Sequence, residues 1–224
     1  MVKFRPLYDQ EFKSIVLWMP NWIGDVVLTL PVLQSLRRAY PTASISAVVK
    51  PPSHELLLGH PAVNRVIPLP SGPNSGIWKR LKFAVSLKKY KFDLGVLFTN
   101  SFESAFLLNL TRAKHRLGYN TDGRSIFLTC PIFTTTFLKK TQYRVEYFFK
   151  ILSPLRLDAP DTKFNPVVKQ DEEIIIREAL FKMGIGENEE FITMHPGTSK
   201  IERGWHLERF GMLCQNILKK DKKK

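Results

Sequence analysis

Short apolar runs alternate with stretches of helical spacing along the first two thirds of the chain. A β-branched apolar run covers 13–19, helical spacing follows over 26–40, and a second apolar run covers 45–49. This order of strand, loop, helix and strand predicts a βαβ unit with a parallel sheet. The same reasoning predicts further strands at 63–69, 93–98 and 116–119, and helices at 78–90, 102–110 and 142–152.

The pattern changes after residue 154. The stretch 155–170 contains two prolines and has no clear periodicity, which favours a linker. Because a single strand cannot form a sheet that buries both of its faces, we expect an N-terminal α/β domain at 1–154 and, at 171–224, the start of a second, truncated α/β domain. The elements predicted in this second part are a helix at 172–183, a strand at 191–194 and a helix at 207–218.

Basic residues exceed acidic ones along the chain. The net charge is +14, of which the final six residues contribute +4, so that +10 belongs to the rest. A field of this sign attracts phosphate groups, whether of nucleic acid, of anionic lipid or of a phosphorylated sugar acceptor. Charge alone does not choose among these three partners.

The two cysteines, Cys130 and Cys214, are isolated in the sequence and form no CxxC motif. This usage is typical of a reducing compartment rather than of a secreted disulfide fold. No secretory signal is visible, and the apolar stretch 15–36 is interrupted by polar residues and prolines, so it is not a clean membrane span. We therefore expect a cytoplasmic protein, one that can work at a membrane surface.

The segment PNWIGD at 20–25 joins the first predicted strand to the first predicted helix. In open α/β sheets, ligands bind at the carboxyl ends of the strands, and Gly24 permits a close backbone approach. The carboxylate of Asp25 can act as the N-cap of the helix. It can equally act as a general base that takes a proton from a sugar hydroxyl. The spacing alone leaves both interpretations open.

The segment NSFESA at 100–105 also follows a predicted strand and begins a predicted helix. Ser101, together with Glu103 or Ser104, can cap that helix. The hydroxyls and exposed N–H groups around Asn100 and Ser101 can instead hold an acceptor sugar or a phosphate. Here too both interpretations remain open.

Basic residues cluster between 112 and 124. Arg116 and Arg124 flank short loops that contain Gly118 and Gly123, an arrangement that can hold an anion. The alternative is an ordinary solvated surface. The predicted helix 78–90 is also basic, and a solvated face is the favoured interpretation for most of its lysines, although they can also attract an acceptor or a membrane.

The segment HPGTSK at 195–200 follows the strand predicted at 191–194. Gly197 can adopt a positive φ, and successive N–H groups can form a phosphate nest there. Taken alone, a loop of this kind is common as an ordinary turn. The side chains that can bind a diphosphate are those of Thr198, Ser199, Lys200 and Arg203.

These segments together resemble one known family. PNWIGDVVLTLPVLQSLRRAYPTASISAVVK is similar to the opening of glycosyltransferase family 9, the lipopolysaccharide heptosyltransferases. NSFESA followed by RLGYNTDGR resembles its heptosyltransferase II branch, and HPGTSKIERGW followed by LERF resembles its ADP-sugar signature. The resemblance covers about 13–218. It implies an α/β fold of the GT-B type, with a complete N-terminal Rossmann-like domain and part of a second one.

The resemblance also implies a reaction. The family transfers L-glycero-D-manno-heptose from ADP-heptose to the lipopolysaccharide inner core, with inversion and without a metal or another cofactor. Asp25 is implied as the catalytic base, and the donor diphosphate is implied to bind Thr198, Ser199, Lys200 and Arg203. The residues implied on the acceptor side are Asn21, Trp22, Gly24, Asn100, Ser101, Arg116 and Arg124.

The implied acceptor is the inner core with its acidic Kdo sugars and heptose on lipid A, reached by peripheral contact with the cytoplasmic face of the inner membrane. The sequence departs from the family signature in two places. Arg203 stands where the family often has Lys, which keeps the charge but changes the geometry of the hydrogen-bond donors. His206 stands where the family usually has Pro, which leaves the loop less rigid. Because the second domain is expected to be truncated, we expect the chain to bind acceptor but to turn over poorly or not at all.

Two other functions fit part of the pattern. A related family 9 transferase with a different sugar donor would share the same motifs. A basic nucleic-acid-binding protein would share the sequence pI of about 9.8, although no recognisable reader motif is present and the basic residues are dispersed over loops. We therefore expect no nucleic-acid partner.

Overall fold

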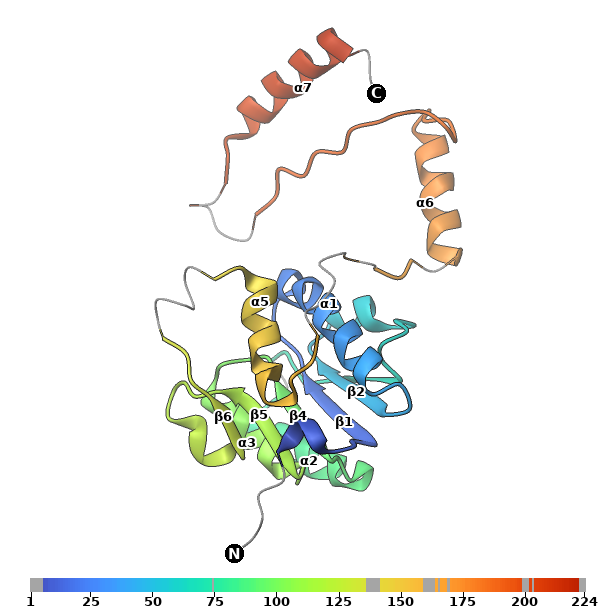
Figure 1. The fold of residues 1–224 in the computed structure, drawn as a ribbon. Helices are drawn as coiled ribbons and strands as arrows, with labels where there is room; N and C mark the ends of the chain where they lie inside the picture. The colour runs from blue at the N-terminus through green and yellow to red at the C-terminus, as the bar shows by residue number, and fades with distance from the viewer. Residues whose placement is uncertain are drawn as a thin grey trace, which may run out of the picture. The chain divides into compact units, whose positions relative to one another are not determined.

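The computed structural model describes residues 6–73, 75–135, 142–158, 164, 166–168, 170–198, 202 and 204–221. The chain divides into two compact units, Met1–Val167 and Val168–Lys224. This division falls within 155–170, the range predicted as a linker. The first unit contains the sheet, and the described residues of the second include two helices (Figure 1).

The first unit is built on a six-stranded sheet with the strand order β3-β2-β1-β4-β5-β6. Every neighbouring pair is parallel, so the order is that of a Rossmann-type sheet, and the predicted parallel α/β fold is confirmed. The strands are β1 (Ser14–Trp18), β2 (Ser44–Val49), β3 (Arg65–Pro68), β4 (Leu94–Leu97), β5 (His115–Tyr119) and β6 (Cys130–Ile132).

Helices cover both faces of this sheet. One face packs against α1 (Ile23–Ala39) and α5 (Arg144–Phe149), through a cluster that includes Leu17, Leu33 and Phe148. The other face packs against α2 (Ile77–Ser86) and α3 (Phe102–Leu110), through a cluster that includes Trp18 and Leu108. The apolar character of β1, β2 and β4 follows from this arrangement, since a parallel strand covered on both faces has no solvent side.

Close packing explains the glycine in the middle of β4. A Cβ atom at Gly95 would lie 2.9 Å from Leu108 Cδ1, a distance that real Cβ atoms essentially never show. Gly95 therefore lets α3 lie directly on the sheet, and the loop between β4 and α3 starts from a fixed position.

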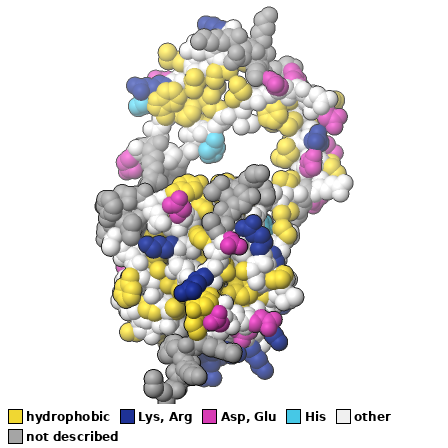
Figure 2. Space-filling view, in the orientation of Figure 1, with side chains coloured by type: hydrophobic (Ala, Val, Ile, Leu, Met, Phe, Trp, Pro, Cys, Tyr) yellow, Lys and Arg dark blue, Asp and Glu magenta, His cyan; other side chains and the backbone are white. Residues whose placement is uncertain are grey.

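The described part of the second unit contains α6 (Gln170–Lys182) and α7 (Leu207–Asp221). The strand predicted at 191–194 does not form, because a strand needs a hydrogen-bonded neighbour and the described residues of this unit supply none. None of the described side chains of this unit is buried. Hydrophobic side chains lie exposed on its surface instead (Figure 2), including Ile174, Ile175, Ile176, Phe181, Met183, Leu207 and Met212.

Two elements of the first unit differ from the predictions. The short strand β6 was not predicted, and the helix predicted at 142–152 is a single α-helical segment, α5, followed by a 3-10 helix at Lys150–Leu155. Pro154 accounts for part of this change, because proline cannot donate to the helical hydrogen-bond ladder. No helix in the described part of the chain is long and apolar enough to cross a membrane.

Candidate functional site

A crevice is expected where the strand order of the sheet reverses. β1 and β4 are neighbours, yet the helix after β1 covers one face and the helix after β4 covers the other. The loops that follow these two strands therefore diverge at the carboxyl edge, which is where open parallel sheets bind ligands. The loop after β1 contains Asn21, Trp22 and Gly24, and the loop after β4 contains Asn100 and Ser101.

Asp25 lies in the first turn of α1 but does not cap it. The helix begins at Ile23, its N-cap is Trp22, and no side chain makes the cap hydrogen bond. The interpretation of Asp25 as only an N-cap is therefore wrong. Its Oδ1 atom instead accepts a hydrogen bond from Nε of Arg144 at 3.3 Å, and the Asp25 side chain keeps 25% of its surface exposed.

The rest of this loop is open to solvent. The Trp22 side chain is 72% exposed. A Cβ atom at Gly24 would meet no atom within 4 Å, so nothing in the described protein requires a glycine there. An approaching ligand would meet bare backbone at this position.

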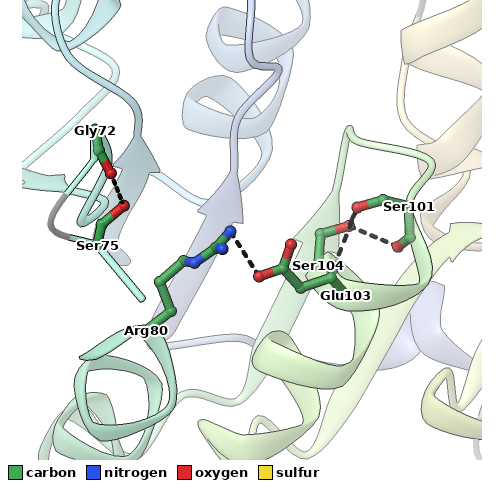
Figure 3. A network of polar contacts seen from close by, with 6 residues as sticks. All are labelled: Gly72, Ser75, Arg80, Ser101, Glu103 and Ser104. Atoms are coloured by element: carbon green, nitrogen blue, oxygen red, sulfur yellow. Dashed lines mark hydrogen bonds and ion pairs between the residues drawn. The ribbon is translucent and has the colours of Figure 1, made fainter. Parts of the chain in front are cut away.

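A small polar cavity of about 50 Å³ lies at the same edge. Lys50 follows β2, Arg80 belongs to α2 and Glu103 belongs to α3, so separate elements converge on it. The Arg80 Nη1 atom forms an ion pair of 2.7 Å with Glu103 Oε1 (Figure 3). The cavity is lined by Trp18, Asn21, Lys50, Leu69, Arg80, Thr99, Ser101, Glu103, Ser104 and Leu107.

Ser101 both caps α3 and lines this cavity. Its Oγ accepts a hydrogen bond of 3.3 Å from the Ser104 backbone N–H, which confirms the capping interpretation for Ser101. The Ser104 hydroxyl donates back to the Ser101 carbonyl at 2.8 Å (Figure 3). Glu103 takes no part in the cap and pairs with Arg80 instead. The same figure shows Ser75 donating to the Gly72 carbonyl at 2.7 Å, which tightens the loop before α2.

Asn100 is held by the protein on both ends of its amide. Its Nδ2 donates to the Tyr147 hydroxyl at 2.8 Å, and its Oδ1 accepts from Arg124 Nη2 at 3.2 Å. Its carbonyl accepts from the Thr121 hydroxyl at 3.2 Å. The residue therefore lies in the crevice loop with its orientation fixed from within the protein.

Arg124 is fully buried, with no exposed surface. Its Nε donates to the Tyr119 carbonyl at 2.8 Å, and its Nη1 donates to the Thr99 carbonyl. Burial lowers the pKa of this guanidinium to about 10. The structure does not support the expectation that Arg124 contacts an acceptor directly, since the side chain is buried and all its described contacts are with protein oxygens. It ties the carboxyl ends of β4 and β5 together and helps to fix Asn100.

Arg116 lies near the beginning of β5, opposite Gly95 of β4. Its Nε donates to the Phe127 carbonyl and its Nη1 to the Ala113 carbonyl, each at 2.6 Å. Burial lowers its pKa. Because the crevice lies beyond the other end of the strands, the structure does not bring Arg116 together with Asp25, and the expected acceptor contact is not supported.

The loop predicted to bind the donor diphosphate belongs to the second unit. Thr198 is described and exposed, whereas Ser199, Lys200 and Arg203 lie outside the described residues. Gly197 does not adopt a positive φ, contrary to the expectation, and a Cβ atom there would lie 3.3 Å from the His195 ring. Across the described ranges, His, Cys, Asp and Glu form no group of three or more that could hold a metal ion.

Sequence reasoning missed three residues of this site, of which Arg144 and Tyr147 carried no usable signal. Arg144 and Tyr147 lie on α5, more than a hundred residues from Asp25, and only the packing of α5 on α1 reveals their contacts. Lys50 follows a predicted strand and could have been found by asking which residues follow each strand at the carboxyl edge.

The fold defines a Rossmann-type protein, a class in which ligands bind at the carboxyl edge of the parallel sheet. The sequence model of glycosyltransferase family 9 (heptosyltransferase) matches residues 80–222, so the chain belongs to this family. The resemblance predicted from the motifs is thereby confirmed.

Relatives and solved structures agree with this assignment. The chain is 26% identical over 212 residues to lipooligosaccharide heptosyltransferase 2 of Haemophilus ducreyi, covering 92% of this chain and 61% of that protein. A family 9 glycosyltransferase structure from Veillonella parvula superimposes with a TM-score of 0.81 at 21% identity, covering 95% of this chain and 60% of that one. For E. coli ADP-heptose lipopolysaccharide heptosyltransferase II the TM-score is 0.73 at 20% identity, covering 92% and 61%. The chain thus spans about three fifths of the length of these relatives.

Proposed function

We propose that this chain contains the acceptor-binding part of a heptosyltransferase that transfers heptose from ADP-heptose to the lipopolysaccharide inner core. The observation that carries the proposal is the position of Asp25. Its partly exposed carboxylate lies in the first turn of α1, at the carboxyl edge where the strand order reverses. The names of the family 9 relatives support the sugar and the acceptor class.

In the proposed reaction Asp25 acts as the general base. It takes the proton of an acceptor hydroxyl while that oxygen attacks the anomeric carbon of the heptose. The bond from that carbon to the ADP oxygen breaks in the same displacement, and the anomeric configuration inverts. ADP leaves with the electron pair, and its diphosphate is stabilised by the loop that contains Thr198, Ser199, Lys200 and Arg203. Cationic side chains then take the place of a metal, and no cofactor is needed.

The acceptor side of the proposal uses the polar cavity. Asn21 and Ser101 offer side chains that suit sugar hydroxyls, and Lys50 and Arg80 offer positive charge to acidic sugars and phosphates. Trp22 and Gly24 border the same loop, where an exposed aromatic ring can pack against a sugar face.

Exposed apolar side chains support peripheral contact with the cytoplasmic face of the inner membrane. Large hydrophobic residues recur in the segments that follow the carboxyl ends of the strands. A lipid-anchored acceptor would bring this edge close to the membrane surface, where aromatic and aliphatic side chains bind favourably. The residues concerned are Trp22, Ile23, Ile77, Trp78, Phe102, Ile126 and Phe133.

We propose further that this chain binds acceptor but transfers heptose slowly or not at all. The support is the second unit, in which none of the described side chains is buried, so that the described residues supply no packed core beneath the segment that contains Thr198. Transfer of radiolabelled heptose from ADP-heptose to a heptose-containing inner-core acceptor tests this statement. Turnover at a rate normal for an intact transferase would contradict it.

Acceptor binding is tested by isothermal titration calorimetry with deacylated inner-core oligosaccharide. Lys50→Gln is expected to weaken binding by about 5- to 10-fold, because it removes one charge-assisted contact. Lys13→Gln is the matched control, since it makes the same charge change at the opposite edge of the sheet, and it is expected to bind within about twofold of the parent.

The same titration separates the competing functions. Salt-dependent binding of generic duplex DNA, with no binding of the oligosaccharide, would favour a nucleic-acid-binding protein. Competition among nucleotide sugars for the chain would separate a heptose donor from another donor sugar.

A further inference from the structure

Arg144 makes the one described side-chain contact to the Asp25 carboxylate. Its Nε donates to Asp25 Oδ1 at 3.3 Å, across 119 residues of sequence. Asp25 belongs to the first turn of α1, and Arg144 is the first residue of α5. The contact therefore depends on the packing of α5 against α1 on one face of the sheet.

The guanidinium group of Arg144 is supported from its own helix. It lies over the ring of Tyr147, 4.8 Å from the centroid, and near the ring of Phe148, at 5.2 Å. These residues are three and four positions further along α5, so they share a face with Arg144. Both rings are buried in the core. A cation packed on two fixed rings loses little freedom when it binds a carboxylate.

The support extends to the second loop of the crevice. The hydroxyl of the same Tyr147 accepts the hydrogen bond of Asn100, which follows β4. One buried tyrosine therefore fixes both the cation that holds Asp25 and the amide on the other side of the crevice. A displacement of α5 would disturb both loops together.

We propose that Arg144 is a positioning residue for Asp25, an inference that rests on the proposed function of Asp25. By binding Oδ1, Arg144 holds the carboxylate plane in one orientation and leaves Oδ2 to the acceptor. None of the residues that the structure describes donates a hydrogen bond to Oδ2. In the proposed reaction the proton of the acceptor hydroxyl moves to Oδ2. Without Arg144 the carboxylate would rotate freely, and fewer of its orientations would face the hydroxyl.

The test is a double-mutant cycle on acceptor binding by the full 224-residue chain, which needs no turnover. The probe is deacylated inner-core oligosaccharide that carries one heptose. Asp25→Ala is expected to raise the dissociation constant about fivefold, the loss of one hydrogen bond. Arg144→Gln is expected to raise it about threefold. In the Asp25→Ala background Arg144→Gln should change it by less than about 1.5-fold, because Arg144 acts through the carboxylate.

Two further variants separate positioning from folding. Arg144→Lys keeps the charge and should recover part of the affinity lost in Arg144→Gln, but not all of it, because an ammonium does not reproduce the planar guanidinium. Arg156→Gln is the matched control, since Arg156 also lies over an aromatic ring, that of Tyr8, at 3.9 Å. It should leave the affinity unchanged. If Arg144→Gln acts only by unfolding the loops around Asp25 and Asn100, its unfolding midpoint should fall. Arg144→Lys should then recover none of the lost affinity.

The outcomes distinguish the two proposals. If the parent chain binds acceptor and Asp25→Ala weakens binding, but Arg144→Gln has the same effect in both backgrounds, Arg144 acts independently of Asp25 and the inference is overturned. Unchanged binding by Arg144→Gln overturns it as well. If the parent chain binds no acceptor at all, the proposed function fails and the inference fails with it.

Discussion

The Asn100 side-chain amide donates a hydrogen bond of 2.8 Å to the hydroxyl of Tyr147. This bond joins the loop after β4 to α5, two segments 47 residues apart in the sequence. Tyr147 has no exposed surface, and its ring stacks on Tyr119 with centroids 4.4 Å apart. The orientation of a crevice residue is therefore set by a buried aromatic pair, so variants beneath the crevice should change ligand affinity.

The first prediction concerns the Tyr147 hydroxyl. Tyr147→Phe keeps the ring and removes the acceptor of the Asn100 N–H, so it should lower the free energy of unfolding by about 1 kcal/mol. It should also weaken acceptor binding several-fold, because the Asn100 amide then keeps only the hydrogen bond from Arg124 and is less firmly oriented. Tyr119→Phe is the control. It removes a buried hydroxyl that donates to the Tyr147 carbonyl at 2.6 Å, so it should cost similar stability with little loss of affinity. Equal affinities for the two variants would contradict the role given to Asn100.

The second prediction concerns Arg124. Arg124→Met removes three hydrogen bonds: the Thr99 carbonyl, the Tyr119 carbonyl and the Asn100 side chain each lose the donor that Arg124 supplies, although the Tyr119 carbonyl keeps the Thr121 backbone N–H at 3.0 Å. Chemical denaturation should show a loss of about 3 kcal/mol. Arg124→Lys should recover little of the lost stability, since a single ammonium group cannot reach the three acceptors that the planar guanidinium binds. A loss below about 0.5 kcal/mol for Arg124→Met would contradict the structural role.

Arg116 provides the contrast to Arg124. It also donates to two carbonyls, but at the other end of the strands. Arg116→Met should lower stability by about 1 to 2 kcal/mol and leave the affinity for inner-core oligosaccharide unchanged. A loss of affinity without a loss of stability would restore Arg116 as an acceptor residue.

Local pattern was sufficient for much of the first unit. The prediction for 102–110 agrees with α3 at both ends, since Ser101 is a strong cap and Phe102 begins an apolar stretch. The apolar runs at 13–19, 45–49 and 93–98 match β1, β2 and β4 to within one residue at each end, because strands buried on both faces are apolar throughout. β6 has only three residues and includes Pro131, so it has no alternation to detect.

The site was less accessible to the sequence. Asp25, Asn21, Asn100 and Ser101 could be found because each follows a strand. The basic cluster at 112–124 was misleading. Charge and nearby glycines suggest an anion site, but they do not reveal whether an arginine is exposed, and Arg124 is buried. Arg144 could not be found, because its partner lies 119 residues away and only the tertiary packing brings them together.

The third prediction concerns pH. His60 has only 1% of its surface exposed, its Nδ1 accepts the Ala62 N–H, and burial lowers its pKa below the usual 6.5. Burial also lowers the pKa of His115. The unfolded chain therefore binds protons more readily, so the free energy of unfolding should fall as the pH drops below 6.5. His60→Asn keeps an acceptor for Ala62 and should flatten this slope, with the remainder due to His115. An unchanged slope between pH 7 and 5 in the variant would rule out His60 as its source.

The fourth prediction concerns the second unit. Its helices expose large hydrophobic side chains, and none of its described residues is buried. Backbone amides of α6 and α7 should therefore exchange with solvent much faster than those of β1, β2 and β4. The chain should also bind a hydrophobic dye in buffer without denaturant. Exchange protection in α6 equal to that in β1 would mean that the unit packs more closely than the structure shows.

The location of the acceptor is the central claim, and an NMR titration tests it most directly. The isotope-labelled 224-residue chain would be titrated with deacylated inner-core oligosaccharide while the backbone amide shifts are followed. The predicted result is that the largest changes fall on Asn21 to Asp25, Lys50 and Asn100 to Glu103, at the carboxyl edge of the sheet. Largest changes at the opposite edge, around Lys114, Thr129 and Arg156, or no saturable change at all, would contradict the account.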